Sequence, residues 1–263
     1  MKCIKKYYFE KSMIKIKNSK EIKKMRRAGK LASQTLDFIE SYIKVGVSTG
    51  ELNKLCHDFI LENKAIPAPL NYQGFPASIC TSINNIVCHG IPSFKDILKE
   101  GDIVNVDITV ILDGYHGDTS RTFLVGNVRR EVKDLVKRSE QAMYEGIEAI
   151  KPGAYLYEVG RAVEKYINKF SYSVVRDYGG HGIGRGFHED PNVLHYYSFE
   201  NKIKLREGMT LTVEPMINQS KSYEVITSRE DGWTVTTKDG NLSSQFEHTV
   251  LVTKDSYEIL TKS

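Results

Sequence analysis

The chain has 263 residues, of which 40% are hydrophobic and 27% charged, and its formal net charge is +4. A chain of this length buries a full core without needing disulfides or a structural metal, and the composition is typical of a globular protein. No apolar run approaches the roughly 20 residues that a membrane-spanning helix needs, so we expect no membrane partner. The lysine-rich start lacks the apolar stretch of a secretory signal, and four cysteines without framework spacing indicate reduced thiols in the cytoplasm.

The charge is distributed unevenly along the chain. Residues 1–30 carry a net charge of +10, whereas the remainder carries −6. This asymmetry excludes a uniformly basic nucleic-acid-binding protein. Residues 1–12 are expected to be a disordered basic leader, and residues 13–263 a single domain. One hypothesis is that the lysines and arginines at 20–30 form a solvated helix surface. The second is that these residues and the leader together bind ribosomal RNA.

Hydrophobic periodicity predicts helices and strands in two successive groups. Apolar residues three and four apart favour a helix over 20–43 with Ser19 as its N-cap, and a second helix from 48 or 49 to 63. Strands are expected at 78–81, 102–112 and 115–125. The second group comprises helices over 131–150 and 157–170, followed by strands at 174–175, 209–217, 233–237 and 249–253.

The second group repeats the first at a constant offset of 107 residues, which aligns Gly46 with Gly153 and Asp107 with Glu214. We interpret the chain as two pseudo-repeat α+β halves, about 20–126 and 127–255, that close on each other. A ligand site at their junction would receive acidic side chains from both halves.

The predicted hairpin around the Asp-Gly turn at 113–114 brings two aspartates together. This turn pairs Leu112 with Tyr115. Asp107 and Asp118 then lie on one face as diagonal cross-strand neighbours, roughly 5–8 Å apart. Such a pair favours a bound divalent metal, and the alternative is a solvated pair on an exposed hairpin face.

The segment 178–189 has five glycines within eight residues and contains His181 and His188. Glycines let the backbone approach a bound group closely, but their spacing matches neither a dinucleotide-binding motif nor a P-loop. Two histidines in such a loop suggest a metal ligand and a substrate contact.

Glu214 and Glu247 add two carboxylates, one within an apolar strand and the other directly before one. With the two aspartates and one histidine they suit two closely spaced divalent ions, such as Mn, Fe or Co, which activate a water and polarise a carbonyl. His89 is a further candidate that could position a substrate amide. His116, on the face of Asp118, is expected to be structural.

These residues closely resemble the motifs of type I methionine aminopeptidases, over about residues 13–260. The motifs lie at 82–92, 101–107, 113–120, 180–189, 212–216 and 231–249. The resemblance implies the pita-bread (creatinase/aminopeptidase) fold, an α+β fold whose two pseudo-symmetric halves surround an antiparallel sheet with helices on its outer face. It also implies co-translational removal of the initiator methionine from nascent proteins with a small second residue.

The resemblance further implies a set of five metal ligands. Asp107 would bind one ion, His181 and Glu214 the other, and Asp118 and Glu247 would bridge both. The two divalent ions would be Co, Mn, Fe or Zn. Glu214 would also accept a proton from the nucleophilic water.

By the same resemblance, His188 would contact the scissile carbonyl and stabilise the tetrahedral intermediate, and His89 would hydrogen-bond near the scissile amide. The methionine pocket would be lined by Tyr72, Phe75, Cys80, Phe187 and Trp233. A monovalent cation would be held by carbonyls of Asn84, Ile86 and Ser243. Pro69 stands where some relatives have a cysteine at the pocket edge, so we expect the shape of that edge to differ from theirs, and Phe75 stands where many relatives have a tyrosine.

Two other classes of protein remain as alternatives. Aminopeptidase P and prolidase share this fold and ligand set, but they usually carry a large extra N-terminal domain, and only about 80 residues precede the first strand motif here. Non-catalytic members of the superfamily lose metal ligands, whereas all five are present in this sequence. We therefore expect a monomeric cytoplasmic enzyme whose partners are nascent N-termini, with a transient ribosome contact through the basic N-terminal region.

Overall fold

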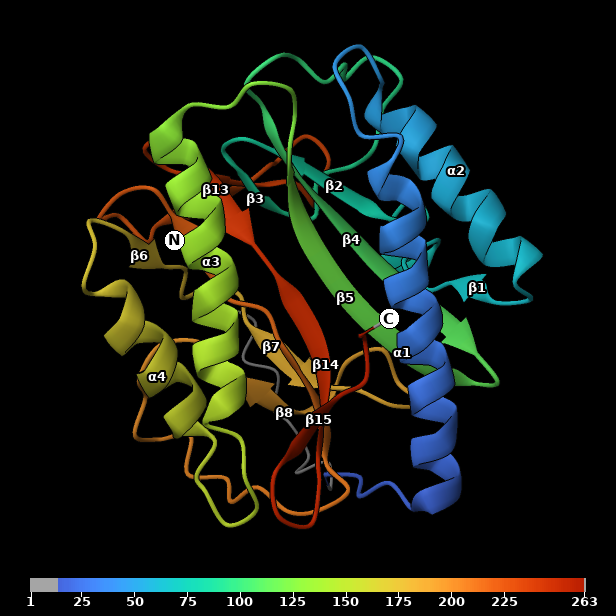
Figure 1. Ribbon diagram of the computed structural model, residues 1–263, viewed down its shortest axis with the longest axis vertical. Coiled ribbons are helices and arrows are strands. Elements are labelled where there is room, and N and C mark those ends of the chain that lie inside the picture. The colour runs from blue at the N-terminus through green and yellow to red at the C-terminus, as the bar shows by residue number, and fades with distance from the viewer. Residues whose placement is uncertain (1–13, 263) are drawn as a thin grey trace.

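The computed structural model describes residues 14–262 and combines a large antiparallel sheet with four α-helices (Figure 1). The leader expected at residues 1–12 lies outside the described residues. Helices α1 (Ser19–Glu40) and α3 (Arg130–Glu148) lie in front of the sheet in Figure 1, with strands of the sheet visible between them. Helices α2 (Thr49–Glu62) and α4 (Tyr157–Ile167) flank them. The helices therefore cover one face of the sheet, which leaves the other face for a site.

The largest sheet has nine strands. Its path runs β1-β4-β5-β14-β9-β7-β8, while β2 pairs with β4 and β15 with β14. In chain order these strands are β1 (Ile66–Pro67), β2 (Cys80–Ile83), β4 (Ile103–Leu112), β5 (Tyr115–Leu124), β7 (Gly180–Gly182), β8 (Glu189–Val193), β9 (Thr210–Val213), β14 (Glu247–Val252) and β15 (Tyr257–Ile259). All the strand pairs are antiparallel. Strand β14 thus joins the β-hairpin of the first half to β9 of the second.

Two smaller sheets complete the architecture. One contains β13 (Ser243–Gln245), β10 (Met216–Asn218) and β6 (Ser173–Val174). The other contains β11 (Val225–Thr227), β12 (Val235–Thr237) and β3 (Ile86–Cys88), and a short 3-10 helix, η1, spans Tyr72–Gly74. The observed α+β fold with its curled antiparallel sheet agrees with the fold class expected from the sequence.

The four helices match the predicted segments, with one correction at the first N-cap. Asn18, not Ser19, caps α1, because its side chain accepts hydrogen bonds from the N–H groups of Lys20 and Glu21. The Glu21 carboxylate in turn accepts from the Asn18 N–H, which completes a capping box. Ser48 caps α2 in the same way with Glu51.

The strand predictions need two corrections. The strand expected at 209–217 is divided into β9 and β10 by Glu214 and Pro215, because proline has no N–H to donate to a sheet. The glycine-rich segment at 178–189 is not only a loop, since it contains β7 and the first residue of β8.

The offset of 107 residues recurs in the backbone geometry. Gly46 and Gly153 both have positive φ angles, of 91° and 85°. An isolated bridge between Ser48 and Ile97 has its counterpart between Tyr155 and Lys204, at the same offset. Each half also has its own buried hydrophobic cluster beneath its pair of helices.

No helix among residues 14–262 is long and apolar enough to cross a membrane.

Candidate metal centre and active site

Strand register places Asp107 and Glu247 in one row across the large sheet. Asp107 of β4 lies opposite Cys80 of β2 on one side and Ser120 of β5 on the other, and Ser120 lies opposite Glu247 of β14. Residues directly opposite in a sheet share a face. Cys80, Asp107 and Glu247 therefore face the same side of four adjacent strands.

The second aspartate lies in the neighbouring row of the same face. Asp118 is opposite Thr109, whose hydroxyl donates to Asp118 Oδ1 at 2.6 Å. This hairpin has the register predicted from its turn, with Leu112 opposite Tyr115. The turn at Asp113 has a positive φ of 53°, as a tight two-residue connection requires.

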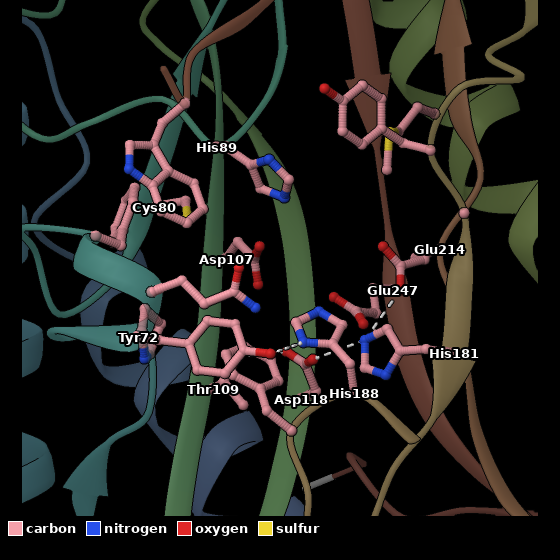
Figure 2. Close-up of a pocket in the computed structure, with 18 of the residues that line it drawn as sticks. Tyr72, Cys80, His89, Asp107, Thr109, Asp118, His181, His188, Glu214 and Glu247 are labelled. Atoms are coloured by element: carbon pink, nitrogen blue, oxygen red, sulfur yellow. Dashed lines mark hydrogen bonds and ion pairs between the residues drawn. The ribbon is translucent and has the colours of Figure 1, made fainter. Parts of the chain in front are cut away.

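The second half contributes His181 from β7 and Glu214 from the residue after β9. His181 Nδ1 donates to the carbonyl of Gly182 at 2.9 Å, which directs Nε2 into the cavity. His181 Nε2 lies 3.6 Å from Asp118 Oδ2 and 3.7 Å from Glu214 Oε1 (Figure 2). Ligand atoms of Asp118, His181 and Glu247 all lie within 4.8 Å of one another. The structure therefore brings donors from both halves to one point.

Burial and mutual repulsion disturb the protonation of these carboxylates. Burial raises the pKa of Asp107 well above its usual range, and the charges of Asp118 and Glu214 raise it further. The pKa of Glu247 is raised by burial and then by Asp118, Glu214 and Asp107. Burial likewise raises the pKa of Glu214 to about 7, although His181 opposes the rise. Burial lowers the pKa of His181, but the hydrogen bond with Asp118 and the charge of Glu214 leave it above the ordinary value.

The donor set fits divalent metal ions. No lysine or arginine is among the described residues that line the cavity, so its carboxylates lack a side-chain cation besides His181. Glu247 Oε1 is buried and has no hydrogen-bond partner among the described residues. Buried carboxylates without partners are costly unless they are paired or bind a metal. Oxygen-rich ligands with one imidazole suit hard or borderline divalent ions.

The two other histidines lie in the same cavity, and neither belongs to the metal-donor cluster. His188 Nδ1 is hydrogen-bonded to Tyr72 Oη at 3.0 Å, and the His188 ring lies 4.2 Å from that of His181 between centroids. His89 lies edge-on to Tyr178 and Trp233, with centroids 5.5 and 6.2 Å away. Burial lowers the pKa of both His89 and His188, and the His181 charge lowers that of His188 further. Both imidazoles are therefore neutral near pH 7.

The five residues expected to bind methionine all line this cavity, which has a volume of about 440 Å³. They are Tyr72, Phe75, Cys80, Phe187 and Trp233. Phe75 meets Trp233 edge-on with ring centroids 5.2 Å apart, and Tyr72 contacts Phe187 at 4.9 Å. The wall is thus aromatic with one thiol, and Pro69 also lines it.

Several residues that support the site were not found from the sequence. The Thr212 hydroxyl donates to Glu214 Oε1 at 2.6 Å, and Gln245 Nε2 donates to Glu214 Oε2 at 3.2 Å. The buried His195 Nε2 accepts the Glu214 N–H at 3.0 Å. Thr212 and Gln245 each precede a predicted ligand by two residues. Side chains two apart in a strand point to the same face, so this spacing could have indicated both residues from the sequence. Nothing in the sequence pattern marks His195.

The remaining expectations concern His116 and the monovalent cation. His116 stacks on Phe187 with centroids 5.5 Å apart, and its Nδ1 lies 3.1 Å from the Gly184 carbonyl oxygen, as fits a structural role. Asn84 and Ser243 are neighbours, since the Ser243 N–H donates to the Asn84 carbonyl at 2.9 Å. Ile86 lies two residues further along in β3. Their binding of a monovalent cation stays a prediction.

Comparisons with known proteins agree with this geometry. Residues 23–254 match the model of metallopeptidase family M24. The chain is 58% identical over 250 residues to a methionine aminopeptidase of Rickettsia prowazekii, covering 95% of this chain and 96% of the relative. A crystal structure of methionine aminopeptidase from Rickettsia prowazekii superposes with a TM-score of 0.93 at 57% identity, covering 95% of this chain and all of the other.

A more distant structural likeness is to a Xaa-Pro dipeptidase from Bacillus anthracis. It has a TM-score of 0.74 and 26% identity, and it covers 94% of this chain but only 62% of that protein. The dipeptidase thus has a large part without a counterpart in this chain.

Proposed function

The chain belongs to metallopeptidase family M24, and on this premise we infer that it is a metal-dependent aminopeptidase that removes methionine from the N-terminus of peptides. The observation that carries this inference is the meeting of acidic donors and His181 beside an aromatic pocket in one cavity. The high identity to methionine aminopeptidases over almost the entire chain supports methionine as the residue removed.

We propose that two divalent ions bind in this cavity. Asp107 would hold one ion, His181 and Glu214 the other, and Asp118 and Glu247 both. Bound there, the ions would polarise the scissile carbonyl and lower the pKa of a water molecule. The fit is supported by the mutual repulsion of the carboxylates and by the unpartnered Glu247 Oε1.

In this proposal Glu214 moves the proton. Its carboxylate would accept a proton from the attacking water and release it to the departing amine. Thr212 and Gln245 each donate to one of its oxygens, so the carboxylate is held in a fixed orientation. A fixed base loses less entropy on reaching the transition state.

The neutral histidines would orient the substrate. His188, fixed by its hydrogen bond to Tyr72, would donate from Nε2 to the scissile carbonyl oxygen as negative charge develops there. His89, held between Tyr178 and Trp233, would hydrogen-bond near the scissile amide. The pocket of aromatic rings and Cys80 would take the unbranched methionine thioether, because sulfur–aromatic contacts are favourable.

The cellular setting is a further part of the proposal. We place the enzyme in the cytoplasm as a monomer that acts on nascent chains with a small second residue. The described thiols of Cys56, Cys80 and Cys88 are free, as is typical of proteins in reducing compartments. A ribosome contact through the basic N-terminal region stays part of the hypothesis, and its test is salt-dependent co-sedimentation with ribosomes, lost on deleting residues 1–12.

A peptide panel tests the proposed specificity. The metal-loaded protein is given Met-Ala-Ser, Leu-Ala-Ser and a matched Xaa-Pro peptide, and the released amino acid is measured. We expect methionine release from Met-Ala-Ser to be the fastest reaction. Faster cleavage of the Xaa-Pro peptide would identify a proline-directed peptidase instead.

A further inference from the structure

The residues directly before α1 lie against the second half of the chain. Ile14 packs on the hydrophobic cluster of that half. The Lys17 N–H donates to the Gly208 carbonyl at 2.8 Å, two residues before β9. In Figure 1 this segment, residues 14–18, runs from the start of α1 towards the strands of the second half. We call it the N-terminal arm, and it brings a lysine side chain to the half that carries His188.

This lysine, Lys17, is buried in an ion pair. It is the only lysine or arginine that is buried within residues 14–262, and buried cations are rare unless they are paired. Its Nζ donates to Glu189 Oε2 at 2.8 Å, and the two side chains are 5% and 6% exposed. Lys15 reaches the same carboxylate at 3.4 Å but is 63% exposed. The buried part of the contact therefore depends on Lys17.

The Glu189 carboxylate also closes the turn that carries His188. Its Oε1 accepts the Gly186 N–H at 2.9 Å, three residues earlier in the chain. Phe187 and His188 lie between the two ends of this closed turn. Because Oε2 accepts from Lys17, each oxygen has its own partner, and the carboxylate cannot rotate without breaking a hydrogen bond. The ion pair thus fixes the turn relative to the N-terminal arm.

The loop that begins this turn packs tightly on the arm. A Cβ at Gly184 would lie 2.6 Å from Lys17 Cε and 3.1 Å from Glu189 Oε1, so only glycine leaves room for the lysine stem. The Gly184 carbonyl also accepts the His116 N–H at 2.8 Å. The loop is therefore held on one side by the N-terminal arm and on the other by the central hairpin.

Stability alone does not account for a buried ion pair at this place. The cost of taking two charges out of water offsets much of their attraction, so apolar replacements of such pairs are often neutral or stabilising. Neither Lys17 nor Glu189 lines the cavity, although His188, the neighbour of Glu189, does. The pair can therefore influence the reaction only through the residues that it holds in place.

His188 has two supports in this arrangement. Its Nδ1 is hydrogen-bonded to Tyr72 Oη at 3.0 Å, which sets the rotation of the ring (Figure 2). The ion pair sets the position of the backbone that carries the ring. We propose that Lys17 is a positioning residue of the peptidase, which acts through Glu189 to hold His188 at the scissile carbonyl. This inference rests on the proposed function, and it adds the N-terminal arm to the parts of the chain that catalysis requires.

Steady-state hydrolysis of Met-Ala-Ser by the full-length, metal-loaded protein tests this role. Lys17→Met removes the charge and keeps an unbranched side chain. The matched control is Lys15→Met, because Lys15 reaches the same carboxylate from an exposed position. Both substitutions are also made in the His188→Ala background, which gives a double-mutant cycle. Mass spectrometry measures the metal bound by every variant.

We expect Lys17→Met to lower kcat about 10- to 100-fold with its bound metal unchanged, because small misplacements of a group that acts in the transition state are costly. Lys15→Met should stay within about twofold of wild type, as is typical of exposed ion pairs. In the His188→Ala background, Lys17→Met should change kcat less than about twofold, because the residue that it positions is already absent.

An equal loss of kcat in both backgrounds would show a structural effect unrelated to His188 and would overturn the proposal. Wild-type kcat in Lys17→Met, an equal loss in Lys15→Met, or loss of metal from Lys17→Met would also overturn it.

A second variant separates catalysis from folding. Lys17→Met with Glu189→Gln leaves no buried charge without a partner, and the amide oxygen can still accept the Gly186 N–H. This double variant should show the same fall in kcat as Lys17→Met. Wild-type turnover by the double variant would count against the positioning role as decisively as wild-type turnover by Lys17→Met.

NMR of the histidine rings provides a readout that does not depend on activity. Proton–carbon spectra are recorded on the zinc-loaded protein, since zinc is diamagnetic, and the His188 signal is assigned by its absence from His188→Ala. We expect this signal to shift in Lys17→Met and to stay in place in Lys15→Met. An unmoved His188 signal in Lys17→Met would overturn the positioning role. Failure of the wild-type protein to hydrolyse Met-Ala-Ser would instead contradict the proposed function.

Discussion

Four carboxylates and one imidazole meet in the cavity, and each ionised carboxylate raises the free energy of ionising its neighbours. Divalent cations relieve this repulsion. Removal of the metal should therefore raise the free energy of the ionised carboxylates at the centre of the site. Thr109 donates to Asp118 Oδ1, which leaves Asp118 Oδ2 free to coordinate. Both oxygens of Glu214 accept hydrogen bonds, from Thr212 and Gln245, and these bonds orient the carboxylate.

Replacing one bridging carboxylate by its amide tests this role. Asp118→Asn or Glu247→Gln keeps the shape of the side chain but removes a charge and an oxygen ligand. We expect both variants to lose bound metal and at least about 100-fold in kcat/KM, since even residues that only support a ligand cost 10–100-fold. Metal content by mass spectrometry and Met-Ala-Ser hydrolysis provide the measurements.

Asp113→Asn is the matched control, because Asp113 belongs to the same hairpin but pairs with Arg27 on the surface. It should keep metal and activity. His188→Ala should keep its metal while kcat falls, because His188 is proposed to act on the substrate. Normal turnover in Asp118→Asn would contradict the ligand assignment.

His195 offers a prediction about a residue that sequence patterns do not mark. Its Nε2 accepts the Glu214 N–H, so His195→Leu leaves a buried donor without a partner. We expect a stability loss of about 1–3 kcal/mol and metal binding weakened about 10–100-fold. Urea unfolding and metal titration measure the two effects.

His57→Leu supplies the comparison for that variant, because His57 is hydrogen-bonded to Ser78 Oγ at 2.7 Å. It should lose stability but keep metal affinity. Equal metal affinity in the two leucine variants would show that His195 has no influence on Glu214.

At the scale of elements, the segment before α1 is tied to the loop that carries His188. The buried Lys17 Nζ donates to Glu189 Oε2 at 2.8 Å, and Gly186 N–H donates to Glu189 Oε1 at 2.9 Å. Burial raises the pKa of Glu189, but these hydrogen bonds outweigh it, so the pKa lies below its ordinary 4.5. The ionised carboxylate thus connects the segment before α1 to the beginning of β8.

This ion pair predicts a stability that depends on pH. Because the folded state lowers the pKa of Glu189, its contribution is present above pH 4.5 and is lost as the pH falls through the lowered value. The difference in unfolding free energy between wild type and Glu189→Gln should therefore be largest above pH 5 and shrink towards pH 3. Urea titrations at several pH values measure it.

Glu258→Gln serves as the reference, since Glu258 pairs with Arg26 on an exposed surface and should have a small effect throughout. A difference between wild type and Glu189→Gln that grows on acidification would contradict the predicted sign.

The helices and the central hairpin were predictable because their patterns are long and local. Three-residue strands such as β7 and β13 were not, since they contain glycine or serine and depend on partners distant in the chain. Asp107 and Asp118 followed from hairpin register alone. The roles of His181, Glu214 and Glu247 needed the family resemblance, because the residue pattern does not show which strands become neighbours.

For the whole molecule, the site depends on the closure of two halves. Asp107 and Asp118 come from the first half, His181 and Glu214 from the second, and Glu247 from β14, which joins β5 to β9. Metal bound between them should therefore stabilise the entire fold, by about 2.7 kcal/mol at a free metal concentration 100 times the Kd.

The most direct test of the account is Met-Ala-Ser hydrolysis by chelator-stripped protein while Mn, Co or Fe is added back in measured equivalents. The account predicts no methionine release from the stripped protein and recovery on addition of metal, with up to two ions bound per chain. Full activity in excess chelator, or no activity with any of the three metals, would contradict it.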